Sequence, residues 1–148
     1  MIIYIGADHR GFELKENLKI FLKNDGFEVV DMGNDHYDEN DDYPDFAKLV
    51  AQKVSEDPGN NRGVVICRSG VGVDVVANKF KKVRSALISD VHQAYLSRND
   101  DDTNVLALSS EFTHEGDARE ILATWLKVPF SNSEKDKRRI QKINNIER

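Results

Sequence analysis

Two short segments of the sequence combine glycines with side chains that can transfer protons or bind anions. The first is GADHRG, residues 6–11, and the second is CRSGVG, residues 67–72, which contains the only cysteine of the chain. Glycine lets backbone N–H groups approach a ligand closely, and the N-terminus of a following helix favours negative charge. We therefore expect these two segments to bind an anionic or oxygen-rich ligand and to act on it.

Cys67 has two interpretations, and the sequence favours the reactive one. A free cysteine is commonly a small buried hydrophobic residue, and Cys67 ends an apolar run. The glycine turn that follows provides backbone amides and a helix N-terminus, which stabilise a thiolate and a developing oxyanion, and Arg68 adds a positive charge. We therefore expect a poised thiol beside Ser69.

Several standard ligand motifs are not matched. The GVG of residues 70–72 lacks the further glycine of the dinucleotide fingerprint, because Val75 stands there, and the Walker lysine is missing. A nucleophile elbow would need a glycine two residues before Ser69, where the cysteine is found. The acidic run 35–45 lacks the glycine and the terminal glutamate of a calcium loop, so we expect a solvated loop and no metal. The four histidines show no metal-ligand spacing.

The composition is that of an ordinary globular protein. The 148 residues are 39% hydrophobic and 32% charged, with both kinds interleaved, so we expect one domain covering residues 1–148. The net charge of -5 argues against a general affinity for nucleic acid or an anionic membrane. A single cysteine cannot form an internal disulfide, and the apolar runs are too short for a signal peptide or a membrane span. A cytoplasmic location is expected.

Short β-branched runs alternate with segments of helical periodicity, which is typical of βα units around a parallel sheet. This pattern predicts an α/β fold, a Rossmann-like three-layer sandwich with a five-stranded parallel sheet. We predict strands over 2–5, 29–30, 63–66, 86–88 and 105–108, and helices over 14–22, 44–54, 73–80, 92–98 and 118–126. Ligands bind at the carboxyl ends of the strands in such sheets, where the segments 6–11 and 67–72 are expected to lie.

The tail after Pro129 differs from the rest of the chain. Ile140, Ile143 and Ile146 form a narrow apolar stripe on a strongly charged helix. Such a stripe is too thin to be buried on all sides. We therefore expect residues 130–148 to contain a helix that packs on a second subunit, in a homodimer or tetramer.

Six segments, in order along nearly the whole chain, resemble one known family: GADHRGFELKENLKIFL, DYPDFAKLVAQKV, GVVICRSGVGVDVVANKF, VRSAL, LSRNDDDTNVLAL and RRIQKI. The family is ribose-5-phosphate isomerase B, together with the two related galactose-6-phosphate isomerase subunits. The resemblance implies an aldose–ketose isomerase that acts on a phosphorylated sugar through an enediolate, without a metal or a cofactor. It makes ribose 5-phosphate the expected substrate.

The resemblance also implies roles for residues around the cysteine. Cys67 would be the base that removes a proton from carbon, and Ser69 would assist proton movement between oxygens. The backbone donors to the enediolate oxygens would be Gly70, Val71 and Gly72. Asp8 and His9 would contact the ring oxygens and the phosphate end of the sugar, and Tyr43 would line the pocket.

The family site is shared between two subunits, and here the donated half departs from the family pattern. Where relatives carry a His-Asn pair to open the ring, this chain has Asp100 and Asp101, of which Asp100 could act as the ring-opening base. Glu111 replaces a phosphate-binding arginine, and Arg68 stands in place of a glycine. The cationic residues left to rebuild a phosphate site are Arg10, Lys135, Arg138 and Arg139, of which Arg139 matches the family.

These departures leave alternatives to a self-sufficient ribose-5-phosphate isomerase. The chain could depend on a paralogous subunit that supplies the missing histidine and arginines, as a galactose-6-phosphate isomerase chain does. It could also be a divergent homologue with a different sugar substrate, or with no activity alone. A nucleotide- or flavin-binding module is suggested by the fold type only, and the failed dinucleotide fingerprint argues against it.

Overall fold

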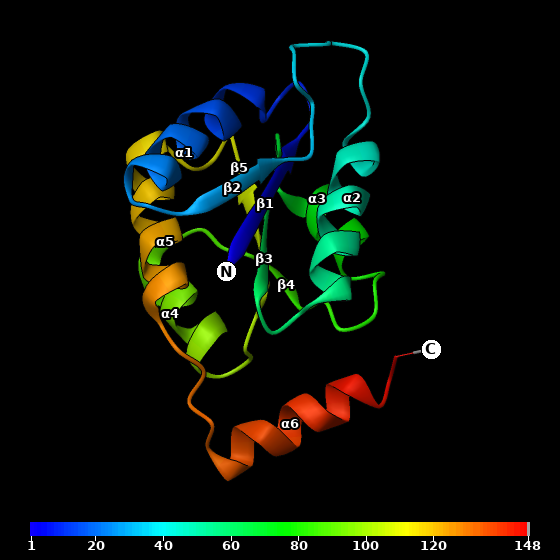
Figure 1. The fold of residues 1–148 in the computed structure, drawn as a ribbon, viewed down its shortest axis with the longest axis vertical. Helices are drawn as coiled ribbons and strands as arrows, with labels where there is room; N and C mark the ends of the chain where they lie inside the picture. The colour runs from blue at the N-terminus through cyan, green and yellow to red at the C-terminus, as the bar shows by residue number, and fades with distance from the viewer. Residues whose placement is uncertain (148) are drawn as a thin grey trace.

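The computed structural model describes residues 1–147 and confirms the predicted alternation of strands and helices (Figure 1). The strands are β1 (Ile2–Ala7), β2 (Glu28–Asp31), β3 (Asn61–Cys67), β4 (Ser85–Leu87) and β5 (Val105–Ser109). The helices are α1 (Phe12–Asn24), α2 (Tyr43–Glu56), α3 (Val71–Ala77), α4 (Val91–Asn99), α5 (Glu115–Lys127) and α6 (Glu134–Asn144). Helix α3 ends before the predicted Phe80, because the backbone N–H groups of Lys79 and Phe80 bond three residues back and form tight turns.

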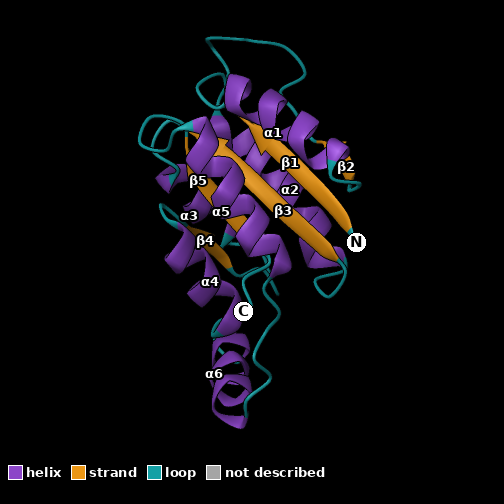
Figure 2. Cartoon of the chain, turned by 90° about the vertical axis from the view of Figure 1, so that its left-hand side faces the viewer, coloured by secondary structure: helices purple, strands orange, loops and turns teal. Residues whose placement is uncertain are grey.

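The five strands form one parallel sheet in the order β2-β1-β3-β5-β4. Helices cover both of its faces, as the two views in Figures 1 and 2 show, so the three-layer α/β architecture is confirmed. In the pairing of β1 with β3, Ala7 lies opposite Ile66, and in that of β3 with β5, Cys67 lies opposite Ser109. The segments that follow these strands therefore leave the sheet at the same edge.

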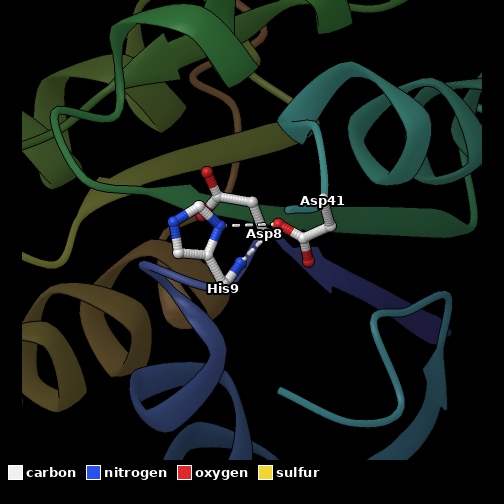
Figure 3. Close-up of side chains that lie close together, drawn as sticks. All are labelled: Asp8, His9 and Asp41. Carbon is white, nitrogen blue, oxygen red and sulfur yellow. Dashed lines mark hydrogen bonds and ion pairs between the residues drawn. The ribbon is translucent and has the colours of Figure 1, made fainter. Parts of the chain in front are cut away.

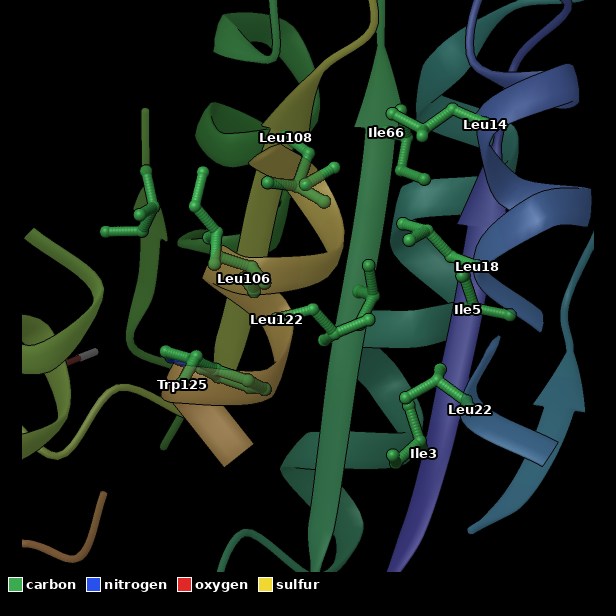
Figure 4. Close-up of a cluster of buried hydrophobic side chains, with 14 of the residues drawn as sticks. Ile3, Ile5, Leu14, Leu18, Leu22, Ile66, Leu106, Leu108, Leu122 and Trp125 are labelled. Carbon is green, nitrogen blue, oxygen red and sulfur yellow. The ribbon is translucent and has the colours of Figure 1, made fainter. Parts of the chain in front are cut away.

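Two apolar clusters, one on each face of the sheet, hold the layers together. On one face α1, α4 and α5 pack on the strands, with side chains that include Leu18, Leu106 and Trp125 (Figure 4). On the other face α2 and α3 pack against the sheet around Val50 and Val65. The central strand β3 is buried on both sides, which explains its nearly continuous run of apolar residues.

Helix α6 lies apart from the three layers, beyond the amino-terminal edge of the sheet (Figure 1). The hydroxyl of Ser133 caps it by accepting the N–H of Asp136 at 3.1 Å. Ile143 and Ile146 are exposed, Ile146 to 78%. The helix predicted within residues 130–148 is thus confirmed, and Arg148 lies outside the described residues. The packing of this helix on a second subunit stays a prediction. Among residues 1–147, no helix has the length and apolar character needed to cross a membrane.

Candidate active site

The turn after β1 lies against the last residues of β3 at the carboxyl edge of the sheet. Gly11 makes this possible, because a Cβ atom on it would lie 2.8 Å from the carbonyl oxygen of Ile66. Ala7 and Ile66 are paired neighbours, so Asp8 and Cys67 leave the sheet from adjacent strands. The structure therefore brings the two predicted segments together.

The turn from Cys67 to α3 directs backbone N–H groups at the cysteine and at the serine. The N–H of Gly70 donates to the Sγ of Cys67 at 3.2 Å, and the N–H of Val71 donates to the Oγ of Ser69, also at 3.2 Å. Gly70 has φ +77°, and a Cβ atom there would lie 2.4 Å from Cδ1 of Leu87. Only glycine fits this turn without strain.

Cys67 is nearly fully buried within one chain, with 4% of its surface exposed. It belongs to the apolar cluster under α2 and α3, and its sulfur faces the turn. A groove of about 700 Å³ lies between α6 and residues 78–86, and a smaller polar cavity of about 260 Å³ adjoins Arg10 and Ser110. Cys67 lines neither of these two cavities, so the expected pocket at the thiol is not formed by them.

Tyr43 lies beside the same turn, at the start of α2. A Cβ atom on Gly72 would lie 2.5 Å from Cζ of Tyr43, so the aromatic ring rests on the backbone of Gly72. The tyrosine is 38% exposed. This position is compatible with the predicted role of Tyr43 in lining a pocket.

Asp8 is buried directly after β1. Its Oδ1 accepts the backbone N–H groups of Arg10 and Gly11, each at 3.1 Å. Burial raises the pKa of this carboxyl above its ordinary value and outweighs the two hydrogen bonds, which act to lower it. Asp8 is thus a carboxyl group that binds a proton more readily than an exposed aspartate.

His9 is held by Asp41, a residue that the sequence analysis did not single out (Figure 3). Oδ1 of Asp41 accepts the backbone N–H of His9 at 2.9 Å and lies 2.7 Å from its ring Nδ1. The side chain of Asp41 is only 4% exposed, so the prediction of a solvated acidic loop was wrong at this position. Partial burial acts to raise the pKa of Asp41, but the hydrogen bonds from His9 and Asn34 lower it below its ordinary value.

A buried lysine fixes the loop that presents Asp41. Nζ of Lys15, on α1, donates to Oδ2 of Asp31 at 2.7 Å and to the carbonyl oxygen of Asn34 at 2.5 Å. The side chain of Asn34 donates to Oδ2 of Asp41 at 3.2 Å. Burial acts to raise the pKa of Asp31, but its hydrogen bonds from Lys15 and Lys19 lower it. Helix α1 and the loop 31–41 are therefore joined by charge-assisted hydrogen bonds.

Asp8, His9 and Asp41 are also the group of side chains, among the described residues, that could hold a metal ion. Each offers one ligand atom, and these atoms lie within 4.8 Å of one another. In this arrangement His9 and Asp41 are already hydrogen-bonded to each other. The polar groups of His9 and Asp41 thus have hydrogen-bond partners within the cluster itself.

Arg68 and Glu111, which the sequence analysis expected to depart from the family pattern, form an ion pair with each other. The Nε and Nη2 atoms of Arg68 donate to the two carboxylate oxygens of Glu111, each at 3.0 Å. The backbone N–H of Glu111 also donates to the carbonyl oxygen of Arg68 at 3.1 Å. The positive charge expected beside the thiol is thus neutralised within the chain.

Apart from Glu111, which follows β5 at the carboxyl edge, the residues expected in the donated half of the site lie at the other end of the sheet. Asp100 follows α4 and precedes β5, where it accepts the side-chain N–H of Asn99 at 2.7 Å. The pKa of Asp101 is raised mainly by burial, and the nearby negative charges of Asp100 and Asp136 raise it further. Lys135 and Arg139 are exposed on α6. One chain therefore does not bring Asp100, Asp101, Lys135 or Arg139 to Cys67.

Comparisons with known proteins match this chain over nearly its whole length. Residues 3–143 match the family model described as Ribose/Galactose Isomerase. Ribose-5-phosphate isomerase B of Mycobacterium tuberculosis is 34% identical over 148 residues, which cover 100% of this chain and 91% of that protein. The crystal structure of ribose-5-phosphate isomerase B from Mycoplasma genitalium with bound ribulose-5-phosphate has a TM-score of 0.95 at 43% identity, covering 97% of this chain and 94% of that chain. The Clostridium thermocellum ribose-5-phosphate isomerase B has a TM-score of 0.93 at 40% identity, covering 99% and 97%.

Proposed function

This chain belongs to the ribose/galactose isomerase family, and we propose that it interconverts ribose 5-phosphate and ribulose 5-phosphate. The observation that supports this activity most directly is the likeness, over 97% of the chain, to a ribose-5-phosphate isomerase B with bound ribulose-5-phosphate. The substrate is a sugar phosphate, and the reaction is an aldose–ketose isomerisation. The alternative of a nucleotide- or flavin-binding module is not favoured by these comparisons.

Cys67 is the proposed base for the carbon-bound proton. It would take the proton from C2 of the open-chain aldose and return it to C1 of the enediolate. The N–H groups of Gly70 and Val71 donate to Cys67 and Ser69 within the chain. This supports a site whose side chains are oriented before the substrate binds. The N–H of Gly72, in the first turn of α3, would add a donor to the enediolate oxygens.

We also propose that two copies of the chain form the site together. The buried cysteine edge and the charged end with Asp100, Lys135 and Arg139 lie at opposite ends of one sheet, so they can meet only between copies. The exposed Ile143 on α6 and the exposed Ile146, two residues after the end of α6, would provide an apolar contact for such an assembly. A second copy would wall off the carboxyl edge and enclose a substrate there.

A cytoplasmic location is proposed for this enzyme. Its substrate is a phosphorylated metabolite, and its single cysteine is free. A reduced thiol of this kind is maintained by the redox conditions of the cytoplasm.

Turnover by the Cys67→Ala variant tests the proposed base. We expect the conversion of ribose 5-phosphate to fall by about 10²-fold to 10⁴-fold, because general base catalysis contributes roughly that much. Thermal unfolding should change little, since the sulfur fills a small volume. Val54→Ala, in the same apolar cluster, is the matched control and should lower stability while retaining turnover. Near-normal turnover of Cys67→Ala would assign the base to another residue.

Mixing two inactive variants tests whether the site is shared. Cys67→Ala removes the cysteine half, and Arg139→Ala removes a cation from the proposed donated half. If two copies form each site, exchanging subunits between the variants should restore part of the turnover, because some sites then contain both intact halves. Mixed assemblies that form without any recovery would contradict the shared site. Turnover of the wild type that requires a different chain would identify a paralogous subunit instead.

A further inference from the structure

The end of α4 and the start of α6, two parts of the donated half, are joined by hydrogen bonds within one chain. We propose that Asp136 is a positioning residue, which holds Arg139 in a fixed relation to Asp100 so that both approach the substrate of a second copy together. This inference rests on the proposed function, since it concerns the site that two copies form. The sequence analysis did not single out Asp136.

Asp136 is a buried acid on an exposed helix. Only 5% of its surface is exposed, and it is the buried residue of α6. An aspartate is seldom buried unless its charge is paired. Here Oδ2 accepts the hydroxyl of Ser131 at 2.6 Å and that of Ser133 at 2.8 Å, and Oδ1 lies 3.5 Å from Nη1 of Arg139. Each carboxylate oxygen therefore has its own task.

Ser131 connects Asp136 to the end of α4. Its backbone N–H donates to the carbonyl oxygen of Asn99 at 3.0 Å, and its hydroxyl donates to Asp136. The side chain of Asn99 donates to Oδ1 of Asp100 at 2.7 Å. Asp100 and Arg139 are thus the two ends of one series of hydrogen bonds and an ion pair, which crosses from α4 to α6.

The charges at the start of α6 also act on the end of α4. The pKa of Asp101 is raised mainly by burial, and the charge of Asp136 raises it further while that of Arg139 lowers it. The hydroxyl of Ser131, and then that of Ser133, lower the pKa of Asp136 below its ordinary value. Asp136 is therefore a carboxylate near neutral pH and can hold a guanidinium there.

Arg139 keeps most of its donors available to a ligand. Its side chain is 56% exposed, whereas that of Asp136 is 7% exposed. The ion pair engages Nη1, and a guanidinium has several further N–H donors in a planar fork that suits phosphate. Holding one edge of the guanidinium lowers the entropy that phosphate binding would otherwise cost.

Asp136 also has a structural role, from which the positioning role must be separated. With Ser133 it forms the N-terminal cap of α6, and a cap alone would stabilise the helix without affecting the kinetics. Ser131 lies before the cap, so its hydroxyl can be removed while α6 keeps its capping residue. The far end of the helix has its own contact, because Glu147 accepts the N–H of Lys82 at 2.7 Å. Loss of the Ser131 hydroxyl should therefore free only the start of α6.

Two variants test the positioning role with opposite effects on charge. Ser131→Ala leaves the charge unchanged, and we expect it to raise KM for ribose 5-phosphate by about 5–10-fold, with kcat within about twofold. The dissociation constant of inorganic phosphate, measured by calorimetry, should rise in parallel. Asp136→Ala should also raise both constants, although losing a negative charge near a phosphate would by itself lower them. Glu134→Ala removes the same charge from an exposed position in the same turn and is the matched control, which should raise neither.

The Arg139→Ala background tests whether Asp136 acts through Arg139. In that background Ser131→Ala should change the dissociation constant of inorganic phosphate by less than about twofold, because the positioned group is gone. Additive losses would overturn the positioning role. So would unchanged constants in both Ser131→Ala and Asp136→Ala, or an equal rise in Glu134→Ala. A wild type without turnover of ribose 5-phosphate would instead overturn the proposed function, and this inference with it.

Discussion

The two ends of the sheet differ in how completely one chain satisfies their polar groups. At the carboxyl edge, Asp8, His9 and Cys67 are each held by hydrogen bonds from the same chain. At the amino edge, Lys135 and Arg139 project from a helix that lies outside the layered body. The comparison teaches that folding of one chain is enough to position the proposed catalytic half. The positions of Lys135 and Arg139 at a substrate would instead depend on the second copy that α6 contacts.

The residues that the resemblance identifies as departures from the family pattern also lie at both ends of the sheet. Asp100, Asp101 and Lys135 lie at the amino end, where a change of charge disturbs no buried partner. At the carboxyl edge, Arg68 and Glu111 form an ion pair and neutralise each other. A change of charge at the amino end therefore costs the fold little, and at the carboxyl edge the charges of Arg68 and Glu111 cancel within the chain.

Replacing Lys15 should cause the largest loss of stability at the carboxyl edge. Lys15→Met is expected to destabilise the protein by about 3–5 kcal/mol, because it leaves buried acceptors without their charged donor. It should also loosen the loop of Asp41 and lower turnover. Chemical denaturation measures the first effect, and Lys48→Met, which affects an exposed pair on α2, is the control. Equal stability of the two variants would contradict the structural role of Lys15.

Adding a methyl group at Gly70 should cause the next largest loss of stability. Gly70→Ala places a side chain at φ +77° against Leu87 and the backbone of Leu108, which should cost about 2–4 kcal/mol. The turn that orients Cys67 would shift with it, so turnover should fall as well. Gly116→Ala lies on α5 with open space around its Cβ position and should be neutral or slightly stabilising. Thermal unfolding of both variants measures the contrast.

The opposite pKa shifts of two aspartates should give opposite dependences of stability on pH. Asp8 has a raised pKa in the folded protein, so its ionisation costs stability as pH rises from its unfolded value, about 3.9, towards neutrality. Asp8→Asn should therefore gain stability over the wild type across that range while losing activity. Asp31 has a lowered pKa, so it stabilises the fold above the unfolded value, and Asp31→Asn should lose stability there. Denaturation between pH 3 and pH 7 tests both signs, and parallel curves would contradict them.

The smallest expected effect belongs to the pair of Arg68 and Glu111. Both side chains are exposed, so a double-mutant cycle with Arg68→Gln and Glu111→Gln should give little coupling, and added salt should reduce it further. The swapped variant Arg68→Glu with Glu111→Arg should retain the stability of the wild type. Strong coupling in thermal unfolding would show that the pair supports the turn beside Cys67.

The fold was predictable because its signals are local. Apolar runs such as residues 63–66 and helical stripes such as Leu14, Leu18 and Leu22 mark the buried elements. Once the strands are known to be parallel, the segments after β1 and β3 must reach one edge. The family resemblance then added roles for Cys67 and Asp8 that spacing alone does not provide.

The missed features depend on contacts between residues distant in sequence. Asp41 lies 32 positions from His9, in a loop without periodicity, so its pairing leaves no pattern. Lys15 has the charge of a surface residue, and its burial depends on the acceptors that the loop provides. The pairing of Arg68 with Glu111 was predictable in principle, because β3 and β5 are neighbours and Cys67 lies opposite Ser109.

The strand order also explains why a ligand would enter between β1 and β3. The chain passes from β1 to β2 in one direction across the sheet, and from β3 through β4 in the other. The helices that follow β1 and β3 consequently leave towards opposite faces, α1 to one and α3 to the other. Ligands of open parallel sheets bind at such a topological switch point, so the winding of the chain predicts the place of chemistry before any side chain is considered.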